Sequence, residues 1–141
     1  MGDVVFEVTD NPADEDIALV GKGLSSFNEA DAGPAGRRAL AVIVRDEAGE
    51  MIGGISGYTA WGWLYVQWLW VAEAARGKAL AGRMLEAAEA EARTRACHGA
   101  YIDTFNPHAL HVYQKAGYVV FGQLPDFPKG RTRSFLSKNL S

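Results

Sequence analysis

The sequence predicts an α+β fold of three layers, in which a mixed central sheet of about six to seven strands carries helices on both faces. Two patterns support this prediction. Between residues 40 and 71, three apolar segments are separated by tight turns, which is typical of an antiparallel meander. The strand, long helix and strand expected from Leu64 to Thr104 should then form a right-handed parallel crossover.

The composition is that of one globular domain covering residues 1–141. The net charge is −3 and no block of like charges occurs, which argues against a nucleic-acid partner. The longest apolar run, Leu64 to Ala72, is too short to span a bilayer, and Met1 to Thr9 lacks a signal-peptide pattern. We therefore expect a cytoplasmic protein without membrane contact. The single cysteine, Cys97, excludes an intramolecular disulfide and is expected to be buried.

The N-terminal region is expected to contain one strand and one helix. Val4 to Thr9 is short and rich in β-formers, which predicts a strand. Asn11 is predicted to cap the following helix, with Pro12 at its first position, and Gly33 to Gly36 should end it. Four residues at helical spacing give this helix an apolar face: Ile17, Val20, Leu24 and Phe27.

The rest of the chain reads as strands alternating with two helices. The predicted strands are Leu40–Arg45, Met51–Ala60, Leu64–Val71, Ala100–Thr104, Tyr118–Phe121 and Arg133–Leu140, the predicted helices are Gly77–Ala96 and Asn106–Gly117, and Gln123–Thr132 is a predicted loop. Glycines inside the second strand, Gly53, Gly54 and Gly57, indicate a bulge or a close backbone approach. Two i, i+4 ion pairs are expected on the exposed face of the longer helix, Glu89–Arg93 and Glu91–Arg95.

The segment from Val71 to Leu85 carries the strongest functional signal. A buried strand leads through a loop into a helix whose first turn consists of small residues, which leaves backbone N–H groups open to an anion. Arg76, Lys78 and Arg83 could add contacts to phosphate oxygens. The alternative is a tightly packed helix start with solvated basic side chains.

Two motifs resemble those of the GNAT acetyltransferase family. They are Arg76-Gly77-Lys78-Ala79-Leu80-Ala81, similar to the family's Gln/Arg-x-x-Gly-x-Gly/Ala element, and Asn106-x-x-Ala109-x-x-x-Tyr113-x-Lys115-x-Gly117-Tyr118. The resemblance covers roughly Leu40 to Leu140 and implies an N-acetyltransferase that uses acetyl-CoA and no metal. It implies cofactor contacts at Leu69, Trp70, Val71, Arg76, Gly77, Lys78, Ala79, Leu80, Ala81 and Gly82. Where the family has glycine, this chain has Ala79; we expect it to be tolerated because a helical residue needs no positive φ.

The resemblance makes Tyr113 the predicted catalytic residue. It places this tyrosine beside the thioester sulfur, and an ordinary pKa of about 10 keeps the hydroxyl protonated so that it can serve as the acid for the leaving thiolate. From the residues alone, Tyr113 is an aromatic packed on the apolar face of its helix. Asn106 is expected to cap that helix and to contact the cofactor. A bulge near Leu69 to Val71 would expose a backbone N–H for the oxyanion.

The general base and the acceptor site are less defined. Glu73, Asp103, His108 and His111 are candidates for the base, and all could equally be solvated polar residues. The predicted acceptor-binding residues are Trp61, Trp63, Tyr65, Asp103 and Phe105, with the loop Asp126 to Gly130 as a closing element; the alternative is that the aromatic residues are core. Strand alternation places Trp63 and Tyr65 on one face and Trp68 and Trp70 on the other, unless a bulge resets it.

The sequence thus predicts transfer of an acetyl group from acetyl-CoA to a primary amine of a small molecule or peptide in a ternary complex. One alternative is a catalytically inactive CoA-binding sensor or regulatory domain. The other is an unrelated α/β domain whose helix N-terminus binds a different phosphate. A homodimer is compatible with the resemblance.

Overall fold

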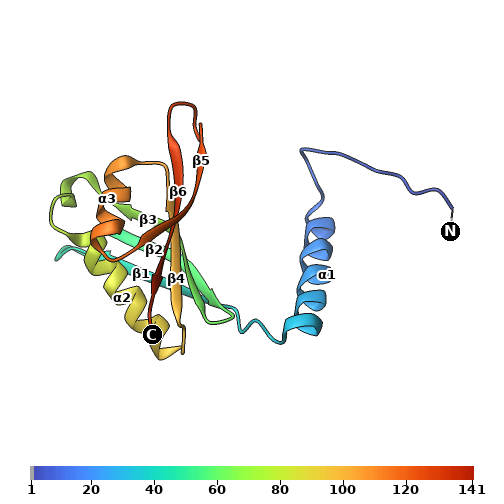
Figure 1. The fold of residues 1–141 in the computed structure, drawn as a ribbon, viewed down its shortest axis with the longest axis horizontal. Coiled ribbons are helices and arrows are strands. Elements are labelled where there is room, and N and C mark those ends of the chain that lie inside the picture. Colours follow the sequence, from blue (N-terminus) through green and yellow to red (C-terminus); the bar gives the residue numbers. More distant parts are fainter. Residues whose placement is uncertain (1) are drawn as a thin grey trace. The chain divides into compact units, whose positions relative to one another are not determined.

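The computed structural model describes residues 2–141, which divide into two compact units, Met1–Ala35 and Gly36–Ser141. The first unit contains helix α1 (Asp14–Ala32). The second contains β1 (Arg38–Arg45), β2 (Met51–Ala60), β3 (Trp63–Val71), the 3₁₀ turn η1 (Glu73–Ala75), α2 (Leu80–Thr94), β4 (Gly99–Thr104), α3 (Pro107–Lys115), β5 (Val119–Pro125) and β6 (Thr132–Asn139) (Figure 1).

The predicted strand over Val4 to Thr9 is wrong. These residues form no regular element, and the side chains of Val5 and Val8 are 93% and 99% exposed. β-Propensity alone does not make a strand, because a strand also needs a hydrogen-bonding partner and a surface to cover. The prediction that Asn11 caps the first helix is also wrong, since Ala13 is the N-cap of α1 and makes no side-chain cap. Gly33 ends the helix as expected, at φ +87°.

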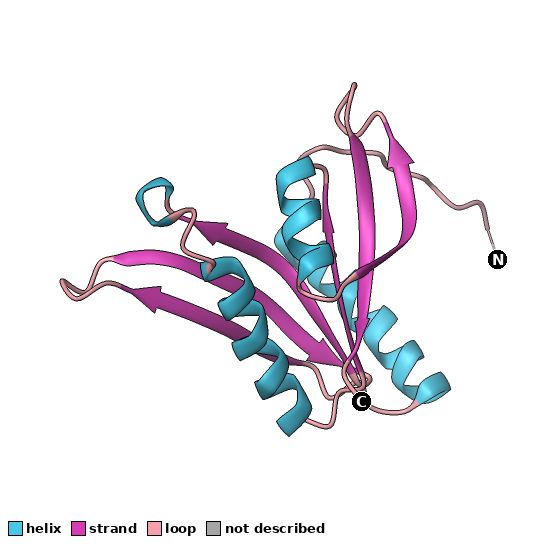
Figure 2. Cartoon of the chain, turned by 60° about the vertical axis from the view of Figure 1, so that its left-hand side comes forward, coloured by secondary structure: helices cyan, strands magenta, loops and turns pink. Residues whose placement is uncertain are grey.

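The predicted mixed sheet is confirmed, with six strands in the order β1-β2-β3-β4-β6-β5. The meander β1-β2-β3 is antiparallel, β3 and β4 are parallel across the α2 crossover, and β6 pairs antiparallel with both β4 and β5. Both α2 and α3 lie on one face of this sheet (Figures 1 and 2). A helix on the other face stays a prediction, because α1 belongs to the other unit.

The core lies between this helix-bearing face and α2 and α3. Leu64 and Leu136 from the sheet and Leu85 from α2 are fully buried in it, and Cys97 is buried at its margin, as predicted. Glu89 is also buried, at 2% exposure, which corrects the expected exposed pair with Arg93. Its two carboxylate oxygens accept hydrogen bonds from Lys138 Nζ at 2.7 Å and from the Tyr118 hydroxyl at 3.0 Å.

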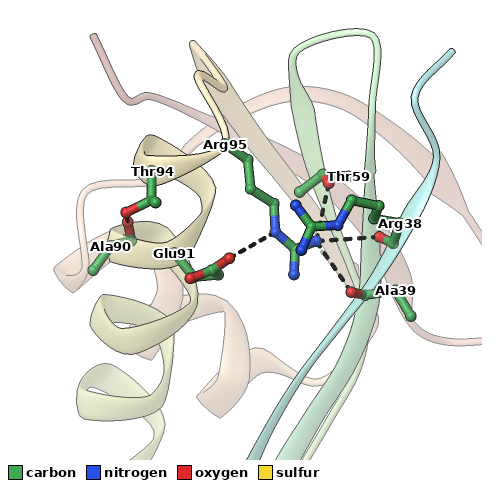
Figure 3. Close-up of polar contacts among 7 residues, drawn as sticks. All are labelled: Arg38, Ala39, Thr59, Ala90, Glu91, Thr94 and Arg95. Carbon is green, nitrogen blue, oxygen red and sulfur yellow. Dashed lines mark hydrogen bonds and ion pairs between the residues drawn. The ribbon is translucent and has the colours of Figure 1, made fainter. Parts of the chain in front are cut away.

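The second expected ion pair, Glu91–Arg95, is confirmed, and Arg95 also holds α2 against the sheet. Arg95 Nε lies 2.8 Å from the Glu91 carboxylate, and Arg95 Nη1 donates to the carbonyl oxygen of Ala39 at 3.0 Å and to Thr59 Oγ1 at 3.2 Å (Figure 3). These contacts hold the C-terminal end of α2 over β1 and β2. The N-terminal end of α2 therefore lies at the opposite end of these strands.

The C-terminal hairpin is longer than predicted. β5 extends to Pro125, because Gln123, Leu124 and Pro125 pair with β6, so the expected loop begins only at Asp126. A proline is compatible with this position because β5 is an edge strand and Pro125 is its last residue. No helix within residues 2–141 is both long enough and apolar enough to cross a membrane.

A bulge in β3 changes the predicted placement of the tryptophans. Ser56 pairs with Trp68 and Gly57 with Val66, so Gln67 is an extra residue in β3. Cross-strand partners share a face, and β2 alternates regularly through this region. Four side chains therefore lie on one face of the sheet, the one opposite α2: Trp63, Tyr65, Trp68 and Trp70.

Candidate active site

The candidate active site lies where β3 and β4 diverge. The two strands pair from Trp63 with Gly99 to Val66 with Ile102, and no register pair joins them beyond that point. Figure 2 shows the two halves of the sheet separating there. The β4-facing backbone edge of β3 from Gln67 to Val71 is thus available to hydrogen-bond a ligand.

Gly57 makes this divergence possible. The bulge at Gln67 brings the β3 backbone so close to β2 that a Cβ at position 57 would collide with the carbonyl oxygen of Tyr65. Only glycine fits such an approach, which confirms the prediction of a bulge or close contact at these strand glycines. The bulge then bends β3 away from β4.

A groove of about 500 Å³ runs from this divergence to the start of α2. All but one of the predicted cofactor-binding residues line it: Leu69, Trp70, Val71, Arg76, Gly77, Ala79, Leu80, Ala81, Gly82 and Asn106. Lys78 is the exception and is exposed outside the groove. Four further residues line the groove although they were not predicted to contact the cofactor, namely Ala75, His108, Ala109 and Val112.

The groove fits an elongated ligand with a phosphate at one end. At the α2 end, a Cβ on Gly77 or Gly82 would meet no atom within 4 Å, so the backbone is open to a ligand. The first N–H groups of α2 are unpaired within the helix and carry a partial positive charge. Arg76 is held beside them by a hydrogen bond from its Nε to the carbonyl oxygen of Val71 at 3.2 Å.

Ala79 adopts a conformation that the sequence analysis did not expect. It is the N-cap of α2 and lies in the left-handed region, at φ 57° and ψ 26°. The expectation that Ala79 needs no positive φ is therefore wrong, because this residue precedes the helix and does not lie inside it. A non-glycine residue in this region is strained by about 1–2 kcal/mol.

Replacing Ala79 with glycine should therefore stabilise the protein. Relief of the left-handed strain outweighs the added flexibility of the unfolded chain, and we expect a net gain of about 0.5–1 kcal/mol in the free energy of unfolding. Urea denaturation followed by circular dichroism measures it. An unchanged or lower free energy for Ala79→Gly would show that the backbone is unstrained there.

Gly82 offers a test of the groove that separates binding from folding. Gly82→Ala should raise the free energy of unfolding by about 0.5–1 kcal/mol, because glycine is unfavourable inside a helix. The same methyl group, and more so the side chain of Gly82→Leu, should lower acetyl-CoA affinity by about tenfold or more by filling the groove. Ala87→Leu, on an exposed position of the same helix, is the control. Unchanged calorimetric affinity for Gly82→Leu would contradict the assignment.

A second pocket, of about 250 Å³, adjoins the groove. Its lining includes the bulged residue Gln67, the predicted acceptor-site residues Asp103 and Phe105, and Arg133, which the sequence analysis did not select. Leu69 and Tyr113 line both this pocket and the groove. Tyr113 therefore stands between the two cavities.

The environment of Tyr113 favours the protonated hydroxyl. Tyr113 is 6% exposed, and burial, with a smaller contribution from the charge of Asp103, raises its pKa to about 12. Its helix starts where predicted, because the Asn106 side chain accepts hydrogen bonds from the backbone N–H of His108 and Ala109 at 2.9 and 3.0 Å. The cap fixes the direction of α3 and hence the position of Tyr113 between the cavities.

Asp103 is held by two partners at the second pocket. Its Oδ1 accepts a hydrogen bond from Arg133 Nη2 at 2.7 Å, and its Oδ2 accepts one from the Tyr65 hydroxyl at 3.3 Å. Tyr65 thus supports the pocket through Asp103. The Nε of Arg133 is buried and has no hydrogen-bond partner within residues 2–141. The same guanidinium lies 4.5 Å from the ring centre of Phe127, which places the predicted closing loop beside it.

Two predicted acceptor residues lie elsewhere. Trp61 is in the turn before β3, and Trp63 is at the start of that strand, where it contacts His98 and Tyr101. Both residues come before Val66, the first residue of β3 that lines the pocket, and neither lines it. Of the base candidates, Asp103 lines the second pocket and His108 the groove, whereas Glu73 and His111 are exposed and line neither. The described residues contain no cluster of three side chains suited to a metal ion.

Comparison with known proteins agrees with this geometry. Residues 11–118 match the Acetyltransferase (GNAT) family. The acetyltransferase Atu2258 of Agrobacterium fabrum is 41% identical over 140 residues, which cover 98% of each chain. The blasticidin-S acetyltransferase of Streptomyces morookaense is 41% identical over 95 residues, which are 67% of this chain and 70% of the relative. A crystal structure of a protein from Agrobacterium tumefaciens, described as an acetyltransferase, superposes with a TM-score of 0.91 at 39% identity, covering 96% of this chain and 99% of the other.

The chain belongs to the GNAT acetyltransferase family. It is an acetyl-CoA-dependent N-acetyltransferase, and the reading as an unrelated phosphate-binding domain is excluded. Acetyl-CoA is the acyl donor of this family.

Proposed function

We propose that the protein acetylates a primary amine of a small molecule or peptide by direct transfer, with Tyr113 as the general acid. One observation carries the proposal: Tyr113 and Leu69 line both the donor groove and the second pocket. An amine bound in the second pocket would meet the acetyl group at their junction. A single shared position suits a ternary complex better than a covalent intermediate, which would need a nucleophile there.

The chemical step balances with the groups at this junction. The amine nitrogen forms a bond to the thioester carbonyl carbon, and the carbon–sulfur bond breaks. The Tyr113 hydroxyl gives its proton to the departing thiolate, and the phenolate regains one from the amine that has become an amide. Backbone N–H groups along Gln67 to Val71 would stabilise the oxyanion, as the unpaired edge of β3 allows.

The second pocket supports the proposal that Asp103 holds the acceptor. Its carboxylate would attract the cationic form of an amine and orient it toward Tyr113, and the amine would release one proton to solvent before its neutral nitrogen attacks. The unpaired Arg133 Nε would be satisfied by an oxygen of the acceptor, so we propose an amine that carries a carbonyl or carboxylate nearby. Phe105 supplies an apolar wall.

The test measures thiol release from acetyl-CoA in the presence of candidate amines. Blasticidin S is the first candidate because of the relative's name, followed by amino acids, peptide N-termini and polyamines. Saturable turnover of one class, lost in Asp103→Asn, is the expected result. Micromolar acetyl-CoA binding without turnover of any amine would instead support a CoA-binding regulatory domain.

A further inference from the structure

The sheet has a second, open face that is rich in aromatic side chains. We define this open face by the residues that the strand registers place opposite α2 and α3: Tyr58, Trp63, Tyr65, Trp68, Trp70, Tyr101 and Phe135, with Phe121 beside them. Tyr65 stacks on Tyr101 with ring centres 4.5 Å apart. A hollow of about 310 Å³ lies between Trp63, Tyr101 and Phe121.

Large parts of the open face are exposed. Trp68, Trp70 and Phe121 are 68%, 51% and 64% exposed. Exposed aromatic side chains that gather on one face mark a contact surface. Aromatic residues are also the type most enriched at protein interfaces.

Helix α1 presents a matching apolar stripe. Its four members are the residues predicted from helical spacing, and they are 55–68% exposed: Ile17, Val20, Leu24 and Phe27. No residue of α1 is buried. Leu19, two residues after Ile17 and one before Val20, points about 120° away from the centre of this stripe.

Apart from the three acidic residues in its first turn, α1 lacks the features that stabilise a helix by itself. Gly21 and Gly23 lie in its interior, each costing about 0.5–1 kcal/mol relative to alanine. Its N-cap makes no side-chain hydrogen bond, and its last turn has no basic residue. A helix of this kind depends on packing its apolar face against a partner surface.

The net charges of the two units favour contact between the first unit of one copy and the second unit of another. Residues 2–35 contain eight acidic side chains and one lysine, a net charge of −7, whereas residues 36–141 contain thirteen basic and nine acidic side chains, a net charge of +4. Arg37 stacks on Tyr58 of the open face at 3.8 Å. An acidic helix with an apolar stripe complements an aromatic face that carries this arginine on a unit of net positive charge.

We propose that the protein is a homodimer in which α1 of each copy packs on the open face of the other. A helix of this length is about 28 Å long, and a strip about 10 Å wide on each surface, counted for both helices, buries about 1,100 Å² in total. This exceeds the roughly 1,000 Å² that a specific interface should bury, and exchange of one element between copies is a low-cost route to a dimer. The segment Gly33 to Arg37, with Pro34 within it, is the hinge.

Light scattering after gel filtration gives the first test, on the full-length chain at about 20 μM. The expected mass is twice the 15.2 kDa of one chain. Leu24→Asp should raise the dimer dissociation constant by about tenfold or more, because a charge would be placed in the apolar contact. Leu19→Asp, the same change outside the stripe, should leave it unchanged. A monomeric mass, or equal effects of the two variants, would overturn the proposal.

Isotope-mixed cross-linking shows where α1 binds. Asn28→Cys, at the margin of the stripe, is labelled with a benzophenone maleimide, while Cys97 is buried and stays unlabelled. Equal amounts of labelled chain and ¹⁵N-enriched unlabelled chain are mixed, equilibrated and irradiated. Cross-links from ¹⁴N α1 peptides to ¹⁵N peptides of β3, β4 or β5 are the expected result. Cross-links confined to one isotope, or to other surfaces, would overturn it. Neither readout depends on activity, so failure here leaves the proposed acetyl transfer intact.

Discussion

Tyr113→Phe should lower kcat by about 100-fold or more while the KM for acetyl-CoA changes by less than about threefold. The variant loses the proton donor between the two cavities but keeps the aromatic ring that lines both. Steady-state thiol release with the acceptor identified by the screen measures both constants. A parallel loss of kcat and of acetyl-CoA affinity would mean that Tyr113 acts by packing.

Tyr118→Phe is the matched control for this change. It removes a buried hydroxyl from the same region, one that donates to Glu89 and lines neither cavity. We expect a loss of about 1 kcal/mol in the free energy of unfolding and a kcat within about twofold. Both tyrosine variants therefore lose a buried hydroxyl, and only one loses an acid.

The pH dependence follows from the environment of Tyr113. Because burial raises its pKa to about 12, the acid stays protonated to well above pH 10. Below pH 10, the kcat of the wild-type protein should therefore not fall through ionisation of Tyr113. Any decrease in kcat in this range should also be present in Tyr113→Phe. The stability of the fold follows the same direction. The neutral, buried hydroxyl contributes to the free energy of unfolding below about pH 10, and this contribution is lost as the pH rises through 12.

Lys138→Met should lower the free energy of unfolding by about 3 kcal/mol. Lys138 is the cationic partner of Glu89, whose side chain is 3% exposed, and its Nζ also donates to the carbonyl oxygen of Ala116 at 2.8 Å. Removing it leaves a buried carboxylate without a counter-charge. Urea denaturation measures the loss. Lys129→Met, in an exposed loop, should change the free energy by less than about 0.5 kcal/mol.

The double variant Glu89→Gln/Lys138→Met separates the ion pair from the packing of the lysine stem. Neutralising the carboxylate should recover part of the loss, because the unpaired buried charge is gone. A double variant less stable than Lys138→Met would show that Glu89 is held mainly by Tyr118. The interaction energy of the cycle gives the coupling between the two side chains.

The sequence was most informative where local chemistry decides the structure. The crossover from β3 through α2 to β4 follows from hydrophobic period, and the start of α3 follows from an asparagine–proline cap that the structure shows with two hydrogen bonds. The same is true of the part of the donor groove between Leu69 and Gly82, because these residues are close in the chain around one helix start.

The predictions failed where contacts between residues far apart in the sequence, or the backbone conformation of a loop, determine the structure. Glu89 has a favourable i+4 partner in the sequence, but its neighbours in space are Lys138 and Tyr118, about 49 and 29 residues away. The left-handed conformation of Ala79 depends on how the loop enters α2, which no propensity of alanine indicates. Arg133 was missed as a pocket residue because its role depends on the pairing of β6 with β4.

The extra residue in β3 also constrains how this protein can vary. Side chains on a strand alternate in parity, and Gln67 inverts that parity for everything after it. Loss of this one codon would leave Leu69 and Val71 facing α2, because Trp68 would then follow Val66 in regular alternation, but it would remove the bulge that bends β3 away from β4. Substitution at position 67 would disturb the fold little, because the side chain is exposed, but it would alter the lining of the second pocket. Natural variants should therefore keep the length of this strand, so that a single insertion, fixed once, leaves a stretch of backbone free for a ligand.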